Sequence, residues 1–167
     1  KSMNVPALMA GFISPLAGTD AWKTFDGKIG GAINCVFEMG SAIASDKLPK
    51  SVEFYNKYKK LFGKELQAGH GPAPAYESVY ILAEAIERAG SLDPDAVTAQ
   101  IKKTDRMGIM GRIRFDAGNQ VVYGFDPKET AVAAVFQWTD DGKRRVVFPE
   151  SLAEAKIQLP KGLKPAK

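Results

Sequence analysis

The clearest pattern in the chain is a helical repeat of apolar residues between residues 76 and 90. Residues three and four positions apart share one face of a helix, so this repeat predicts a helix that Gly90 ends. Its apolar face, which is expected to be buried, consists of Tyr76, Val79, Tyr80, Ala83 and Ile86. Its opposite face, which is expected to meet solvent, consists of Glu77, Glu84 and Arg88.

Two further helices and a strand are predicted on either side of this repeat. Asp93 is a good N-cap and Pro94 suits the first helical position, so a second helix begins there. Polar and apolar residues alternate from 112 to 115, which is the periodicity of a strand. Residues 50–62 predict another amphipathic helix, with a buried stripe made of Val52, Tyr55, Tyr58 and Phe62.

Both ends of the chain carry apolar runs that predict strands. Residues 5–12 and 29–37, with a short helical turn between them, are typical of neighbouring strands in a parallel sheet. Ligands bind beyond the carboxyl ends of such strands, which points to residues 12–15 and 37–39. Residues 131–138 and 145–148 predict a hairpin around a turn at residues 140–142.

Composition restricts the class of protein. The chain has 167 residues, of which 45% are hydrophobic and 25% charged, as in soluble globular proteins, and it lacks an apolar run of the roughly 18 residues that span a membrane. Its net charge of +4 is dispersed, and its densest basic run, at residues 57–60, lies on the polar face of a predicted helix. Nucleic-acid binding is therefore not expected. The chain starts without an initiator Met and close to an apolar strand, so we expect a fragment of a longer protein.

Residues that catalysis or metal binding would need are few. Cys35 lies within an apolar run and His70 in a glycine- and proline-rich loop, and they are the only cysteine and histidine, so a zinc site lacks ligands. Gly108 and Gly111 are not followed by the residues of a phosphate-binding loop. Glu38 could act as a general base, but no group of matched role is evident. A binding role without metal or cofactor is favoured over a small α/β enzyme that uses Glu38 and His70.

Several motifs together resemble the carboxyl half of type I periplasmic binding proteins. These proteins are the leucine/isoleucine/valine-binding and amide-binding receptors of branched-chain amino-acid ABC transporters. The motifs are AYESVYILAEAIERAG, an Asp-Pro helix start, GRIRFD, and VFQW before a DG hairpin, with FYNKYKKLFGKE upstream. The resemblance runs from about residue 5 to residue 159. It implies an α/β fold of two three-layer, parallel-sheet lobes that close on a small ligand, and of which this chain holds only part.

The resemblance also implies how the chain is divided between the two lobes. Residues 1–38 would end the second lobe, and residues 39–130 would form the later part of the first. Residues 131–159 would return as a crossover strand and hairpin to the second lobe, and residues 160–167 would be a disordered tail. The missing amino-terminal part of the same protein would be a partner, unless the chain forms a homo-oligomer or a swapped assembly.

Three segments match positions that line the ligand cleft in the family. They are the loop of residues 12–15 with Phe12, Ile13 and Ser14, the crossover with Phe37 and Glu38, and the loop of residues 70–76 before the predicted helix, with Pro74 and Tyr76. Amino-acid binders often place an acid in the first segment to pair with the ligand's ammonium group, and this chain has none there. Burying an unpaired ammonium is costly, so an aromatic or other carboxylate is favoured over a branched-chain amino acid, unless Glu38 supplies the charge.

The resemblance thus predicts a solute-binding component of an ABC importer. It would be periplasmic, or extracellular and tethered to the membrane, and a membrane permease would recognise its closed form. A ligand-sensing receptor or regulatory domain of the same fold is the alternative, because the same lobes serve that role.

Overall fold

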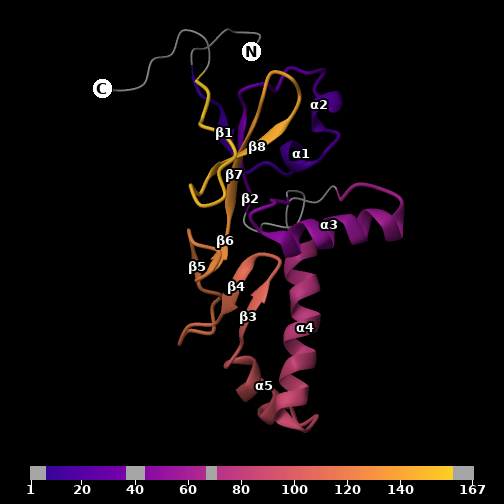
Figure 1. The fold of residues 1–167 in the computed structure, drawn as a ribbon, viewed down its shortest axis with the longest axis vertical. Helices are drawn as coiled ribbons and strands as arrows, with labels where there is room; N and C mark the ends of the chain where they lie inside the picture. Colours follow the sequence, from indigo (N-terminus) through magenta and orange to yellow (C-terminus); the bar gives the residue numbers. More distant parts are fainter. Residues whose placement is uncertain (1–6, 37–43, 67–70, 160–167) are drawn as a thin grey trace.

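The computed structural model describes residues 7–36, 44–66 and 71–159. Two four-stranded sheets follow one another along the long axis of the molecule, and helices lie beside them (Figure 1). We call them the upper sheet and the lower sheet, after their positions in this view. Among the described residues, no helix is both long and apolar enough to span a membrane.

The upper sheet joins strands from both ends of the chain. Its strands are β1 (Ala10–Gly11), β2 (Ile33–Val36), β7 (Ala134–Trp138) and β8 (Arg144–Phe148), in that spatial order. β1 and β2 are parallel, as the strand–helix–strand pattern predicts, whereas the other two pairs are antiparallel. The predicted hairpin is confirmed, because β7 and β8 are consecutive and paired.

Two short helices cover one face of the upper sheet. α1 (Ser14–Ala17) occupies a segment that the sequence predicts as loop, and α2 (Ala21–Thr24) is the predicted helical turn. Their buried residues pack against Phe136, Trp138 and Val146 in what we call the upper core. The indole N–H of Trp138 donates to the carbonyl oxygen of Leu16 at 2.9 Å, which fixes α1 on the sheet.

The lower sheet is built from the later part of the chain. Its strands are β3 (Asp105–Gly108), β4 (Gly111–Arg114), β5 (Tyr123–Gly124) and β6 (Ala131–Val132), in the spatial order β3-β4-β6-β5. β3 and β4 form an antiparallel hairpin, and β5 and β6 are parallel. Only Ala133 separates β6 from β7, so the single apolar run at residues 131–138 supplies a strand to each sheet.

Three longer helices pack beside the lower sheet. They are α3 (Pro49–Phe62), α4 (Pro72–Ala89) and α5 (Pro94–Ile101), and all three are predicted by the sequence. α3 joins the two halves of the structure, because Leu48 at its N-cap is part of the upper core while Phe54 belongs to the core beside the lower sheet. We call the latter the lower core.

The buried face of α4 differs from the predicted one. Ala73, Glu77, Ile81 and Ala85 are buried, whereas the predicted core residues Val79 and Tyr80 are 67% and 44% exposed and Ala83 is also exposed. The prediction that Glu77 meets solvent is wrong because the lower sheet presents a cation and a backbone N–H to it. The predicted stripe of α3 is partly right, because Tyr55 and Tyr58 are half-buried against the lower core while Phe62 is exposed. The buried residues of this helix are Ser51 and Phe54.

The start of α5 is confirmed in detail and gives a stability prediction. The Asp93 side chain accepts a hydrogen bond from the Ala96 N–H at 2.9 Å, and Pro94 follows it. We expect Asp93→Ala to lower the free energy of unfolding by about 1 kcal/mol, because an amide at the helix start loses its acceptor. Urea unfolding measures the change, with the exposed Asp95→Ala variant as control. An equal effect of both variants would contradict a specific capping role.

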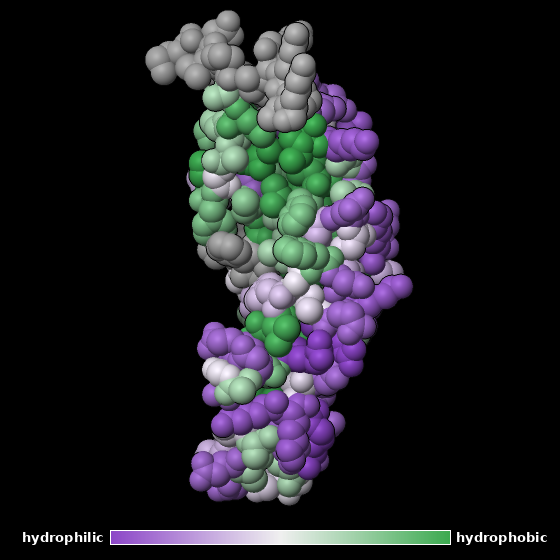
Figure 2. Space-filling model, turned by 90° about the vertical axis from the view of Figure 1, so that its left-hand side faces the viewer, coloured by the Kyte–Doolittle hydropathy of each residue, from purple (hydrophilic) through white to green (hydrophobic). Residues whose placement is uncertain are grey.

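The face of the upper sheet opposite α1 and α2 is apolar and open to view (Figure 2). Register places Cys35 and Val135 on this face as a cross-strand pair, with Phe148 of β8 opposite Val135. Cys35 and Val135 are half-buried, and Phe148 is exposed. The described chain thus covers this sheet with helices on one side. The α/β class is confirmed, and the single helical layer fits an incomplete three-layer lobe.

Candidate functional site

The loop after β1 carries three of the predicted ligand-binding residues. Phe12 and Ile13 are 48% and 43% exposed, and Ser14 begins α1 and is exposed. The Ile13 N–H donates to Oδ1 of Asn34 at 2.8 Å. Asn34 is fully buried on β2 and sets the backbone of this loop. In the sequence, Asn34 is the one polar interruption of the apolar run 29–37, but this alone does not assign it to the site.

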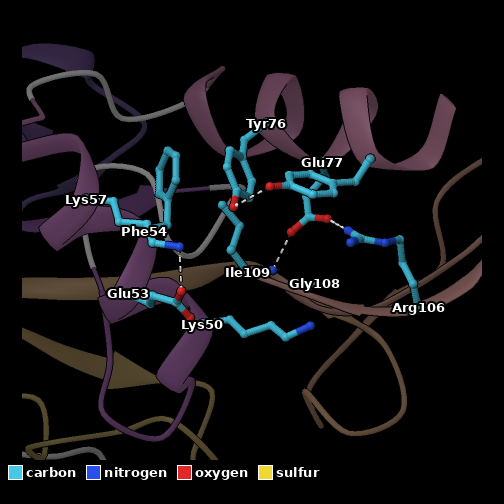
Figure 3. Close-up of a pocket in the computed structure, with 10 residues that line it drawn as sticks. Lys50, Glu53, Phe54, Lys57, Tyr76, Glu77, Arg106, Gly108 and Ile109 are labelled. Atoms are coloured by element: carbon cyan, nitrogen blue, oxygen red, sulfur yellow. Dashed lines mark hydrogen bonds and ion pairs between the residues drawn. The ribbon is translucent and has the colours of Figure 1, made fainter. Parts of the chain in front are cut away.

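Pro74 and Tyr76 were predicted in the loop before a helix, but they lie within α4, which begins at Pro72. Tyr76 lines a cavity of about 220 Å³ between α3, α4 and the hairpin of β3 and β4 (Figure 3). Pro74 is half-buried in the first turn of α4 and is not part of the lining, and neither is the loop of residues 12–14. Phe37, Glu38 and His70 lie outside the described residues.

Aromatic rings form one wall of the cavity. The Tyr76 ring centroid lies 4.8 Å from that of Phe54 on α3 and 4.9 Å from that of Tyr80, one turn along α4. The Tyr76 hydroxyl donates to the Tyr80 oxygen at 3.3 Å, and this bond together with burial raises the pKa of Tyr76. The Tyr76 phenol is therefore neutral at physiological pH, and the wall offers ring faces and hydroxyls to a ligand.

Charged residues of α3 form the opposite side. Lys50 donates through Nζ to the Met107 carbonyl oxygen at 2.5 Å, and it forms no ion pair with any residue that the structure describes. Glu53 and Lys57 are paired at 2.7 Å, and the hydrogen bond from Lys57, with its charge, lowers the pKa of Glu53. Lys50 is thus the cation that a ligand's carboxylate could approach without breaking an ion pair.

The floor of the cavity is a buried ion pair. The Glu77 carboxylate, 2% exposed, pairs with the Arg106 guanidinium, 15% exposed, and accepts the Ile109 N–H at 2.5 Å. Nε of Arg106 also donates to Glu84 at 3.1 Å. Burial lowers the pKa of Arg106, but arginine stays charged at any physiological pH. The carboxylates of Glu77 and Glu84, both on α4, therefore hold the β3–β4 hairpin against this helix through Arg106.

The cavity suits binding of an organic anion. Its lining holds three cations, Lys50, Lys57 and Arg106, against two carboxylates, Glu53 and Glu77, so the net formal charge is positive. In the described part of the chain, no group of His, Cys, Asp and Glu is arranged to hold a metal ion. Sequence reasoning found Tyr76 but missed Lys50 and Arg106, because isolated cations in a helix and a strand look like ordinary surface residues.

A comparison with protein families shows to which family the chain belongs. The model of a family described as periplasmic binding protein matches residues 8–144. The chain belongs to this family. The match includes both the loop of residues 12–14 and Tyr76, and it confirms the resemblance found in the sequence. It is a family of binding proteins, as the prediction of a non-enzymatic role requires.

Relatives of this periplasmic binding protein agree with the assignment. A Leu/Ile/Val-binding protein homolog 7 from Brucella melitensis is 29% identical over 125 residues, which are 71% of this chain and 29% of the relative. A structure from Silicibacter pomeroyi, provisionally assigned as a branched-chain amino acid ABC transporter, has a TM-score of 0.74 at 18% identity and covers 96% of this chain and 42% of its own.

A further structure shows the same fold with a ligand. The substrate-binding protein of an ABC transporter from Desulfitobacterium hafniense, in complex with Leu, has a TM-score of 0.60 at 17% identity and covers 87% of this chain and 37% of its own. At such low identity these structures bear on the fold alone. The chain spans less than half the length of each of the three relatives.

Proposed function

We propose that this chain is part of the solute-binding component of an ABC importer, which captures a small organic ligand by closure of two lobes. Family membership and the name of the Brucella relative support the binding role, and the name of the Silicibacter structure supports the link to ABC transport. The family's name supports a periplasmic location. An extracellular location with a membrane tether is the alternative. A membrane permease would be the partner of the closed form.

The proposed division into lobes is supported by the two sheets. Residues 1–38 and 131–159 would belong to the second lobe, whose sheet is the upper one, and β1, β2, β7 and β8 fall in these ranges. Residues 39–130 would belong to the first lobe, which includes α3–α5 and the lower sheet except for β6. The open apolar face of the upper sheet would be covered by the remainder of the two-lobed protein, or by a second copy in a swapped assembly.

We favour a carboxylate ligand with a flat or apolar body. No acid is present at Phe12, Ile13 or Ser14 to pair with an ammonium group, and Lys50 supplies a cation at the cavity. The rings of Phe54 and Tyr76 would contact the apolar body. The observation that carries this choice is that Tyr76 and Lys50 line the same cavity. Among the predicted cleft positions within residues 7–36, 44–66 and 71–159, only Tyr76 is part of this lining.

A thermal-shift measurement on the full-length protein tests the ligand class. We expect benzoate or phenylacetate to stabilise it, since a ligand at about 100 times its dissociation constant adds about 2.7 kcal/mol. Stabilisation by L-leucine alone would overturn the preference for carboxylates without an amino group. Failure of all three compounds would count against the proposed importer role.

A pair of variants locates the binding site. Lys50→Gln is expected to weaken benzoate binding about tenfold, which corresponds to the loss of about 1.4 kcal/mol from a charge-assisted hydrogen bond. Lys60→Gln is the matched control, because Lys60 is exposed on the same helix and does not line the cavity. Isothermal titration calorimetry measures both. Equal affinities of the two variants would place the ligand elsewhere.

A further inference from the structure

The end of β8 and the turn that follows it contact the part of the chain that carries the lower sheet. We call residues 148–153 the latch segment. Leu152 is fully buried in the upper core. Just beyond the segment, the Glu154 N–H donates to the Val146 carbonyl oxygen on β8 at 2.8 Å. The latch segment is therefore fixed to the upper sheet at both of its ends.

Phe125, which follows β5 of the lower sheet, is the first partner of the latch segment. Its ring centroid lies 5.2 Å from that of Phe148 in an edge-to-face arrangement, a geometry that aromatic pairs favour. The Ser151 hydroxyl donates to the Phe125 carbonyl oxygen. This contact lies at the junction of the two sheets (Figure 1). Both phenylalanines are exposed, so their contact is not a consequence of burial in either core.

The turn that contains Phe125 is itself held by the lower sheet. β5, which precedes it, pairs with β6, and the Arg112 N–H on β4 donates to the Pro127 carbonyl oxygen at 2.9 Å. Phe125 is thereby fixed relative to the lower sheet, as Phe148 is fixed relative to the upper one. A change of the angle between the two sheets would therefore alter the distance between the two rings.

A third contact joins the latch segment to the start of α3. Lys47 directly precedes Leu48, the N-cap of this helix, and donates through Nζ to the Ala153 carbonyl oxygen at 2.8 Å. Further along the same helix, the Phe54 ring packs on Tyr76 in the cavity wall. The latch segment thus contacts both the lower sheet and the helix that supplies part of the cavity wall.

We propose that the latch segment restricts the angle between the two sheets and thereby lowers the entropy that is lost when the lobes close on a ligand. This inference rests on the proposed binding function, because the angle affects affinity only where closure accompanies binding. A protein that samples few angles loses less entropy on binding than one that samples many. Exposed contacts open more readily than core contacts, so they limit the movement without preventing it.

Distances between spin labels in the full-length protein test the latch segment without any ligand. The labels are attached at Lys23→Cys in α2 and Asp95→Cys in α5, both exposed, with Cys35→Ala so that no other cysteine of this chain is labelled. Phe125→Ala with Ser151→Ala removes the ring contact and the hydrogen bond. We expect the distance distribution from double electron–electron resonance to become about twofold wider. An unchanged width would overturn the proposal.

Matched variants separate the latch segment from a general loss of packing. Phe62→Ala removes another exposed ring, whose centroid lies 4.7 Å from that of Tyr58 within α3. Ser78→Ala removes a hydroxyl that donates to the Pro74 carbonyl oxygen at 2.7 Å within α4. Each of these contacts stays within one helix, so this double control should leave the width unchanged. An equal widening in the control would overturn the proposal.

The contact of Lys47 provides an independent arm. Lys47→Met removes the donor to the Ala153 carbonyl oxygen but keeps an unbranched stem. Added to Phe125→Ala with Ser151→Ala, it should widen the distribution further, because it loosens a different element. Lys60→Met, exposed on α3, is the control and should add nothing. Equal widths with and without Lys47→Met would overturn the part of the proposal that includes α3.

Binding of benzoate and L-leucine links the angle to function. Isothermal titration calorimetry should show that Phe125→Ala with Ser151→Ala weakens binding of whichever probe the wild type accepts by about threefold, because closure then costs more entropy. Unchanged or tighter binding despite a wider distribution would overturn the link to closure. If the wild type binds neither probe, the proposed importer role fails, whereas the spin-label distances still decide whether the latch segment restricts the angle.

Discussion

Replacement of Glu77 by leucine is expected to lower the free energy of unfolding by about 3 kcal/mol. The change removes the main counter-ion of Arg106, which is buried beneath the cavity, and breaking a buried pair from one side costs about 3–5 kcal/mol. It also leaves the Ile109 N–H without its acceptor. Glu84 still pairs with Arg106 at 3.1 Å, which keeps the expected loss at the lower end of that range.

A double variant separates the charge from the packing. Urea unfolding of the full-length protein should show that Glu77→Leu with Arg106→Met is more stable than Glu77→Leu alone, because no unpaired charge is then left buried. Glu87→Gln, exposed on the same helix, should have little effect. The free energy of unfolding lost by the double variant could instead equal the sum of the losses in the two single variants. In that case the ion pair would not be the reason for the burial of Glu77.

Replacement of Trp138 by alanine is expected to cost about 3–5 kcal/mol of stability. Trp138 is 2% exposed in the upper core, between Phe136 and Trp22, and large aromatic side chains leave cavities that the surroundings fill only partly. Trp138→Phe should cost less, because a ring remains and only the hydrogen bond to the Leu16 carbonyl is lost along with some packing.

Thermal unfolding followed by circular dichroism measures both variants, and limited proteolysis locates the effect. Trp138→Phe should expose α1 to cleavage before the rest of the upper core, because its indole N–H is one of the contacts that hold this helix. The control is Trp22→Phe, since Trp22 contributes only partly to the upper core and donates no hydrogen bond to α1 in the described structure. Equal loss in the two phenylalanine variants would argue against a special role of the indole donor.

Local signals in the sequence located most elements correctly. A left-handed glycine marks the end of α3 and of α4, and the two helices end before Gly63 and Gly90. The start of α4 was predicted too late, at residue 76 rather than at Pro72, because the prolines before it indicate a loop. Asp93 marks the start of α5. These signals act within a few residues of backbone, so they do not depend on the rest of the fold. β3 was missed, since Asp105–Gly108 has too little apolar alternation to stand out.

The buried face of a helix and the partner of a charged side chain depend on residues far away in the sequence, and both were harder to predict. Helical spacing groups Val79 and Tyr80 correctly on one side of α4, but it cannot say that the lower sheet lies on the other side. A lone glutamate at Glu77 looks like a surface residue until Arg106, on a strand nearly thirty residues away, is placed beside it. Hydrophobic pattern alone therefore assigned the wrong face to this helix.

Of the candidate site, likewise, only part could be predicted from the sequence. Tyr76 was found because it matches a cleft position of the family, and the structure places it in a cavity. Lys50 was missed, since its role depends on how α3 meets α4 and the β3–β4 hairpin. The predicted positions Phe12, Ile13 and Ser14 stay predictions, and no described contact joins them to the cavity.

Because α3 has residues in both the upper and the lower core, a rotation at one of its ends would displace the other end. Leu48 is held among the residues of the upper sheet, while the helix extends over 14 residues to Phe62, about 20 Å away. A rotation of about 10° at Leu48 would carry the far end by about 3.4 Å, and would move Phe54 against Tyr76 by less than half as much. A small change of the angle between the sheets would thereby displace the cavity wall by a distance comparable to the size of a methyl group.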